Sequence, residues 1–170
     1  MRRLCAVLAL LIVGLTACGQ SLTQSEAIAL ANPTALPTAV TAISDTASFA
    51  EALRASGAVV TQDGDVSLAF LHTVGTILHV DDQRVQVYQY AADEDARADA
   101  ARFSRDGAWV SSDIGATLVN WFATPHLYRV PHLIAVYIGD QSSTLRLLEN
   151  LLGAQFAGGA NPYHAAHVAS

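Results

Sequence analysis

The sequence has no lysine, and its two cysteines, Cys5 and Cys18, both lie near the start of the chain. A disulfide within the residues that follow is therefore excluded, and a domain there depends on a hydrophobic core for its stability. The sequence also lacks the Gly-x-Ser-x-Gly, His-Glu-x-x-His and phosphate-loop motifs of common hydrolases, zinc proteases and nucleotide-binding proteins. We accordingly expect no cofactor and no enzymatic activity.

Long hydrophobic runs are missing too, because the apolar run near the N-terminus covers only residues 4–15. A membrane-spanning helix needs about 20 apolar residues. Arg2 and Arg3 precede the run, and a short segment of small residues follows it, as in a secretory signal. We therefore interpret residues 1–17 as a signal peptide.

The sequence Leu-Thr-Ala-Cys-Gly at residues 15–19 resembles the lipobox of bacterial lipoproteins. In that motif the cysteine receives acyl chains such as palmitate and becomes the mature N-terminus. Two or more acyl chains give stable membrane anchoring, whereas one chain binds only marginally. We expect acyl chains on Cys18 to hold the protein outside the cytoplasm, on the outer side of the cytoplasmic membrane or in the periplasm.

Positive charge is scarce in the mature chain. The signal contains Arg2 and Arg3 but none of the fifteen acidic residues, so the mature chain is more acidic than the whole-chain charge of −6 indicates. An acidic surface argues against nucleic acid and against a polybasic lipid-binding patch. The expected partners are the membrane, through Cys18, and a protein or peptide of the envelope.

Composition and periodicity divide the chain after the signal into three parts. Residues 18–45 are rich in Ser, Thr, Ala and Gln without sustained periodicity, which predicts a lipidated flexible tether. Residues 46–157 are strongly periodic and predict one globular domain. Residues 158–170 begin with two glycines and predict a flexible tail.

Within the domain, Ser48 and Glu51 fit a capping box at the start of a first helix that Gly57 ends. Two further helices are expected over about 93–103 and 143–152. Strands are expected over about 58–61, 68–80, 84–90, 117–129 and 132–138.

The order α-β-β-β-α-β-β-α with short connections predicts an α+β fold, with a single mostly antiparallel sheet of about five strands and three helices mainly on one face. The opposite face is then at least partly open. Side chains alternate along a strand, so the tyrosines and glutamine of residues 84–90 share a side opposite Val85 and Val87. An open face rich in Tyr and Gln is typical of a contact surface. We expect this surface to consist of Gln86, Tyr88, Tyr90 and Tyr137.

Histidines are the remaining candidates for chemistry. His72 and His79 flank Gly75, and His126 and His132 flank a predicted turn. Each pair could converge across a hairpin, with Asp81 or Asp113 as a further metal ligand. His164 and His167 have i, i+3 spacing but fall in the predicted tail. Surface or strand-edge positions are the commoner explanation, so we expect no metal site, and an envelope metal-binding protein or a hydrolase is the alternative. The weak metal candidates are His72, His79, His126 and His132.

Five blocks carry a resemblance: SFAEALRASGAVV, VQVYQYA, WFATPHLYR, LIAVYIGD and LLGAQFAGG. They resemble an uncharacterised family of small bacterial lipoproteins, and the resemblance covers most of residues 48–159. It implies one small domain in the cell envelope and brings no catalytic residues. The sequence thus predicts a lipid-anchored, non-enzymatic binding or accessory module.

Overall fold

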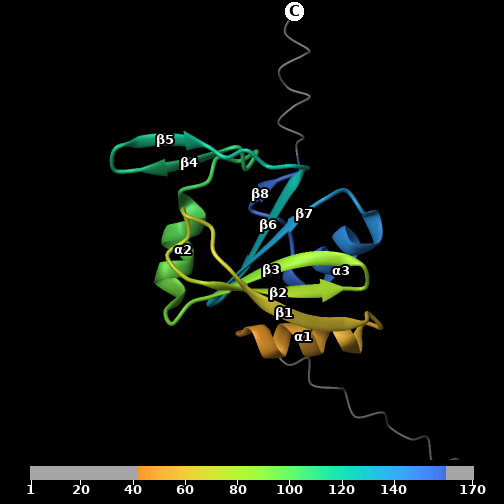
Figure 1. Ribbon diagram of the computed structural model, residues 1–170. Helices are drawn as coiled ribbons and strands as arrows, with labels where there is room; N and C mark the ends of the chain where they lie inside the picture. Colours follow the sequence, from red (N-terminus) through yellow and green to blue (C-terminus); the bar gives the residue numbers. More distant parts are fainter. Residues whose placement is uncertain (1–41, 160–170) are drawn as a thin grey trace, which may run out of the picture. The chain divides into compact units, whose positions relative to one another are not determined.

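A computed structural model describes residues 42–159 (Figure 1). The expected signal peptide, Cys18, most of the tether, and His164 and His167 of the tail lie outside the described residues. Within residues 42–159, no helix has the length and apolar character needed to cross a membrane.

The expected α+β class and the mostly antiparallel sheet are confirmed. Three helices are present in the described part, namely α1 (Thr46–Ala55), α2 (Asp93–Ala101) and α3 (Ser142–Leu152). One six-stranded antiparallel sheet has the spatial order β1 (Val60–Val66), β2 (Gly75–Val80), β3 (Gln83–Gln89), β7 (Leu133–Ile138), β6 (Pro125–Val130) and β8 (Ala157–Gly158). The strands β4 (Trp109–Ser112) and β5 (Gly115–Leu118) form a separate two-stranded ribbon.

The first helix begins earlier than expected, because Asp45 and not Ser48 is its N-cap. The Asp45 carboxylate accepts a hydrogen bond from the Ser48 N–H at 2.7 Å, and the Ser48 hydroxyl accepts one from the Asp45 N–H at 3.2 Å. This is a capping box that satisfies two backbone donors at the helix start. Asp45, assigned above to the tether, therefore belongs to the domain.

Two expected strand boundaries are wrong. The strand expected over about 58–61 continues to Val66 as β1, with a β-bulge between Gln62 and Asp65 where the pairing register shifts and Gly64 has a φ of 58°. The segment 68–74, expected as a strand, is irregular, and its Leu71 is buried against the core. Leu68, Phe70 and Leu71 of this segment pack into the hydrophobic core instead of alternating along a strand, whereas Val74 is 61% exposed.

Strand boundaries in the C-terminal half of the domain also differ from those expected. The first part of the strand expected over 117–129 is wrong, because the ribbon β4–β5 ends at Leu118 and the next strand, β6, begins at Pro125. The last strand, β8, pairs with β6 so that Gly158 lies opposite His126. The folded domain therefore includes Gly158, which was expected in the tail.

Each face of the main sheet has its own hydrophobic core. On one face, α1 and α3 pack Phe49, Leu53 and Leu148 against the strands. On the other face, α2 packs Ala96 and Ala100 into a core of tyrosine, tryptophan and aliphatic side chains (Figure 1). Two of the three helices share a face as expected, but the opposite face is not open.

Candidate functional site

The expected tyrosine contact surface is wrong, because its side chains are buried. Tyr88 and Tyr90 do share a face, as predicted, but α2 and the loop at 68–74 cover it. Tyr137 pairs with Val85 and lies in the core on the opposite face. The exposed fractions are 7% for Gln86, 0% for Tyr88, 5% for Tyr90 and 1% for Tyr137.

A network of polar side chains around Asp99 joins α2 to the loop at 68–74. The Asp99 side chain is 1% exposed. One carboxylate oxygen lies 2.5 Å from His72 Nδ1 and accepts from Arg102 at 3.2 Å. The other accepts from the His72 N–H at 2.9 Å and from the Tyr90 hydroxyl at 2.8 Å. The buried carboxylate is thus fully hydrogen-bonded and paired with a cation, as burial of a charge requires.

The ionisation of Asp99 fixes which nitrogen of His72 carries a proton. Burial raises the pKa of Asp99, but hydrogen bonds from the His72 N–H, the Tyr90 hydroxyl and the His72 ring outweigh it and hold the pKa below the ordinary value of 3.8. An ionised carboxylate only accepts hydrogen bonds, so His72 Nδ1 must carry the proton that lies between the two groups. In the neutral imidazole, Nε2 is then an acceptor. The His72 side chain is 75% exposed.

Beside this network is a cavity of about 500 Å³. It is lined by His72, Thr73, Tyr90, Ala91, Asp95 and Ala98. His72 was expected only as a weak metal candidate, and Asp95 and Asp99 were not expected as site residues. Asp95 and Asp99 have i, i+4 spacing and therefore share a helix face.

The four candidate histidines do not converge. His72 precedes β2, whereas His79 lies near the C-terminal end of that strand. His79 Nε2 is 3.2 Å from a carboxylate oxygen of Asp63. His126 is 5% exposed, lies 2.9 Å through Nδ1 from Gln155 Oε1 and stacks on Tyr137. His132 lies in the turn at the other end of the β6–β7 hairpin. Among residues 42–159, no three His, Cys, Asp or Glu side chains are grouped to hold a metal ion.

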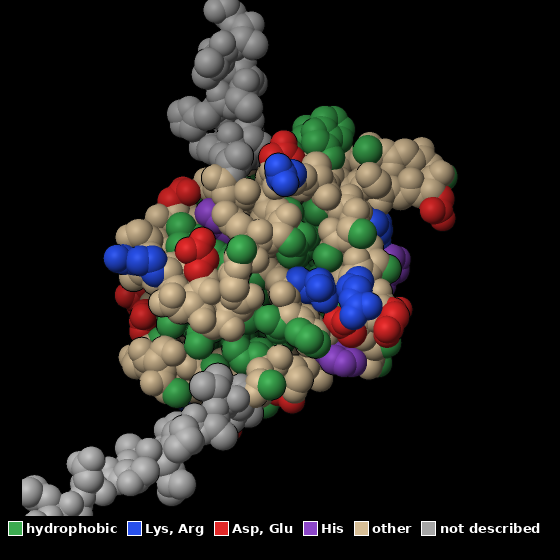
Figure 2. Space-filling view, turned by 180° about the vertical axis from the view of Figure 1, so that it is seen from behind, with side chains coloured by type: hydrophobic (Ala, Val, Ile, Leu, Met, Phe, Trp, Pro, Cys, Tyr) green, Lys and Arg blue, Asp and Glu red, His purple; other side chains and the backbone are tan. Residues whose placement is uncertain are grey.

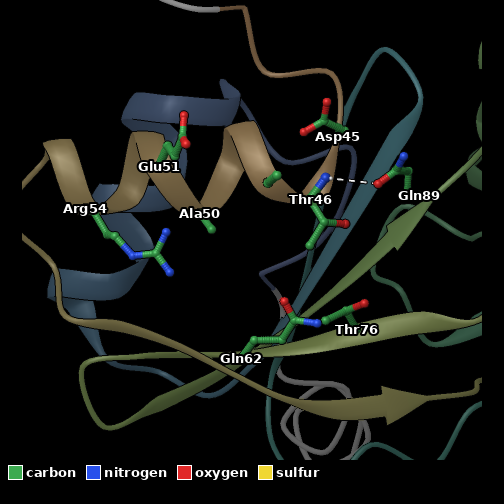
Figure 3. Close-up of a pocket in the computed structure, with 9 residues that line it drawn as sticks. Asp45, Thr46, Ala50, Glu51, Arg54, Gln62, Thr76 and Gln89 are labelled. Atoms are coloured by element: carbon green, nitrogen blue, oxygen red, sulfur yellow. Dashed lines mark hydrogen bonds between the residues drawn. The ribbon is translucent and has the colours of Figure 1, made fainter.

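A second hollow, of about 520 Å³, lies between α1 and the sheet (Figure 3). Figure 3 shows Gln62 and Thr76 below the helix, on the strands. Several of its polar groups hold α1 in place. The Thr46 N–H donates to Gln89 Oε1 at 3.1 Å, and Arg54 donates to the Val60 carbonyl at 3.2 Å. Because these contacts are internal to the fold, this groove is a weaker candidate site.

Exposed hydrophobic side chains concentrate on β4, β5 and the loop that follows, residues 109–122, here named the apolar ribbon. Trp109 and Leu118 are cross-strand partners with exposed fractions of 46% and 48%. Ile114, in the turn, is 99% exposed, and Phe122 is 82% exposed. Figure 2 shows the ribbon projecting from the domain, with hydrophobic side chains beside its base.

The other side of the ribbon is fixed to the domain. Val110 is 3% exposed and forms a β-bridge with Phe103. Arg102 and Ser111 exchange two hydrogen bonds, from the Ser111 N–H to the Arg102 carbonyl at 2.9 Å and from Arg102 Nε to the Ser111 carbonyl at 2.8 Å. The ribbon therefore presents Trp109 and Leu118 outward on a fixed base.

Comparison of the chain with protein-family models, curated proteins and solved structures finds no match. The resemblance to small bacterial lipoproteins therefore stays a prediction.

Proposed function

We propose that this chain is a lipid-anchored protein of the bacterial cell envelope, exposed outside the cytoplasmic membrane, whose domain binds a protein partner through the apolar ribbon. The observation that carries the proposal is the set of exposed side chains on the ribbon. Large exposed apolar groups on one element mark interaction sites in soluble domains. The four side chains are Trp109, Ile114, Leu118 and Phe122.

Two features favour a protein over the lipid surface as the partner. Asp113 lies next to Ile114 in the turn, and the chain as a whole carries a net charge of −6, so an anionic bilayer would repel it. The tether also enters the domain at α1, while the ribbon lies across the domain from α1 (Figure 1). The described chain therefore begins on the side of the domain away from the ribbon.

The contact surface is tested by capture of partners from solubilised membranes. Trp109→Ser and Leu118→Ser should each abolish retention of the captured protein, since a central Trp typically contributes about 2 kcal/mol or more to binding. Val59→Ser is the matched control, because Val59 is 70% exposed but lies before β1, away from the ribbon. Retention that survives both ribbon substitutions in folded protein would contradict the proposed surface.

The anchor is tested separately at Cys18. Cys18→Ala should prevent acylation and leave an unprocessed precursor in the membrane fraction. Mass spectrometry of the mature protein shows directly whether Cys18 carries acyl chains. Release of a mature protein from the Cys18→Ala variant, at the mass of the substituted chain without the signal peptide, would show that an ordinary signal peptidase acts instead.

A further inference from the structure

The side chains that line the cavity beside His72 present hydrogen-bond acceptors, because the polar hydrogens of His72 Nδ1, Thr73 and Tyr90 are already used inside the fold. The Tyr90 hydroxyl donates to Asp99, and the Thr73 hydroxyl donates to the Gln89 carbonyl at 3.1 Å. His72 Nδ1 carries the proton shared with Asp99, which leaves Nε2 of the neutral ring as an acceptor. The side chains of these three residues can therefore only accept further hydrogen bonds.

Asp95 adds a negative charge to this arrangement. It lines the cavity from the first turn of α2, is exposed, and has no ion-pair partner in the described part of the chain. The nearby cation, Arg102, is paired with Asp99. The remaining lining residues, Ala91 and Ala98, are small and apolar, so they leave room for a planar group and its methylene stem.

We propose that this cavity binds the guanidinium group of an arginine side chain presented by a peptide or protein. A guanidinium has five N–H donors and no acceptor, which complements a site that offers only acceptors. The Asp95 carboxylate supplies the opposite charge, and His72 Nε2 supplies a second, directional acceptor. The site involves none of the exposed side chains of the apolar ribbon and does not depend on the function proposed for it.

The test is a calorimetric titration of the full mature chain, in neutral detergent, with N-acetyl-L-arginine amide. N-acetyl-L-citrulline amide is the matched ligand, because it has nearly the same shape without the positive charge. We expect the arginine compound to bind about tenfold or more tightly, the ratio that one charged hydrogen bond supplies. Equal binding of both compounds, or no binding of the arginine compound, would overturn the proposal.

Two substitutions assign the binding to the cavity. Asp95→Asn should weaken arginine binding about tenfold, whereas Glu94→Gln, which removes the same charge from a neighbouring residue outside the cavity lining, should have little effect. His72→Asn keeps an N–H donor for Asp99 but removes Nε2, and should also weaken binding. An equal effect of Asp95→Asn and Glu94→Gln would mean that only the general field of the acidic protein acts, and would refute the site.

A substitution in the apolar ribbon separates the two proposals. Trp109→Ser should leave arginine binding intact, so a failure of the ribbon proposal is distinguishable from a failure of this one.

Discussion

Three buried tyrosines differ in what their hydroxyl groups contact, and this difference predicts opposite effects of the same substitution. The Tyr88 hydroxyl donates to Gln86 Oε1 at 2.7 Å. The Tyr137 hydroxyl donates to Gln83 Oε1 at 2.9 Å. The Tyr128 hydroxyl is buried and has no hydrogen-bond partner within residues 42–159. Burial, with a smaller contribution from Glu149, raises the pKa of Tyr128 to about 12.

These contacts determine how each Tyr→Phe substitution should change the free energy of unfolding. An unpaired buried hydroxyl costs about 1–3 kcal/mol, and its removal leaves only a small void. Tyr128→Phe should therefore stabilise the domain by about 1 kcal/mol. Tyr88→Phe removes a hydrogen bond and leaves the Gln86 carbonyl oxygen buried without its donor, so it should destabilise by about 1–2 kcal/mol.

The assay is urea unfolding of the non-lipidated chain, followed by tryptophan fluorescence, with the slope of the transition compared between variants. Tyr137→Phe serves as a second hydrogen-bonded control and should destabilise like Tyr88→Phe. A Tyr128→Phe variant that is less stable than the wild type by 1 kcal/mol or more would show that the hydroxyl is satisfied in solution. It would refute the reasoning from burial.

Two further predictions concern the packing around β2 and α2. Gly75→Ala would place a Cβ 2.7 Å from Tyr88 Cε1, so it should destabilise by about 1–3 kcal/mol in the same urea assay; an unchanged midpoint would mean that the ring moves freely. Asp99→Asn removes the charged partner of Arg102, whose side chain is 25% exposed, and leaves the buried donors of the network without a full set of acceptors. It should destabilise by about 1–3 kcal/mol, with faster proteolysis at residues 67–74. Because the folded pKa of Asp99 lies below the ordinary value of 3.8, its stabilisation is complete at neutral pH and is lost as the pH falls below that value. Thermal melts from pH 6 downward should show a steeper loss in the wild type than in Asp99→Asn.

A pattern contained within one segment was enough to predict that a helix or a strand forms there. The alternation of Val85 and Val87 with Tyr88 is confirmed, since neighbouring side chains of a strand must point to opposite faces. The alternation of side chains does not show whether solvent or another element covers each face of the sheet. The assignment of the tyrosine face to solvent failed because α2 packs there through Ala96 and Ala100, whose small side chains allow close approach.

Residues with strong turn preference misled the prediction in two places. The strand expected over about 58–61 stopped before Gly64, but the chain accommodates this glycine in a bulge while pairing continues to Val66. Ser111, Ser112 and Asp113 resemble a loop, yet cross-strand contacts order the first two as β4. Pairing depends on partners distant in sequence, and no local pattern contains that information.

The candidate sites were harder to predict than the fold. Asp99 and His72 meet only because the loop at 68–74 folds back on α2. The composition of the ribbon contained a usable signal, since Trp109, Ile114 and Leu118 are large apolar residues separated mostly by small and polar ones. That signal was overlooked because residues 109–116 were given no element and Leu118 was placed in the strand expected over 117–129.

The order of strands in the main sheet has a consequence for how the chain folds. β1, β2 and β3 form one meander, β6 and β7 form one hairpin, and only the pairing of β3 with β7 joins them into a single sheet. Turns between neighbouring strands close quickly, whereas the β3–β7 contact must close the long intervening segment that includes α2 and the ribbon. We expect this docking step to limit the folding rate, with φ-values higher around Val87 and Ala135 than in the ribbon. The seam between β3 and β7 is then the place where a partly folded chain exposes two unpaired strand edges at once.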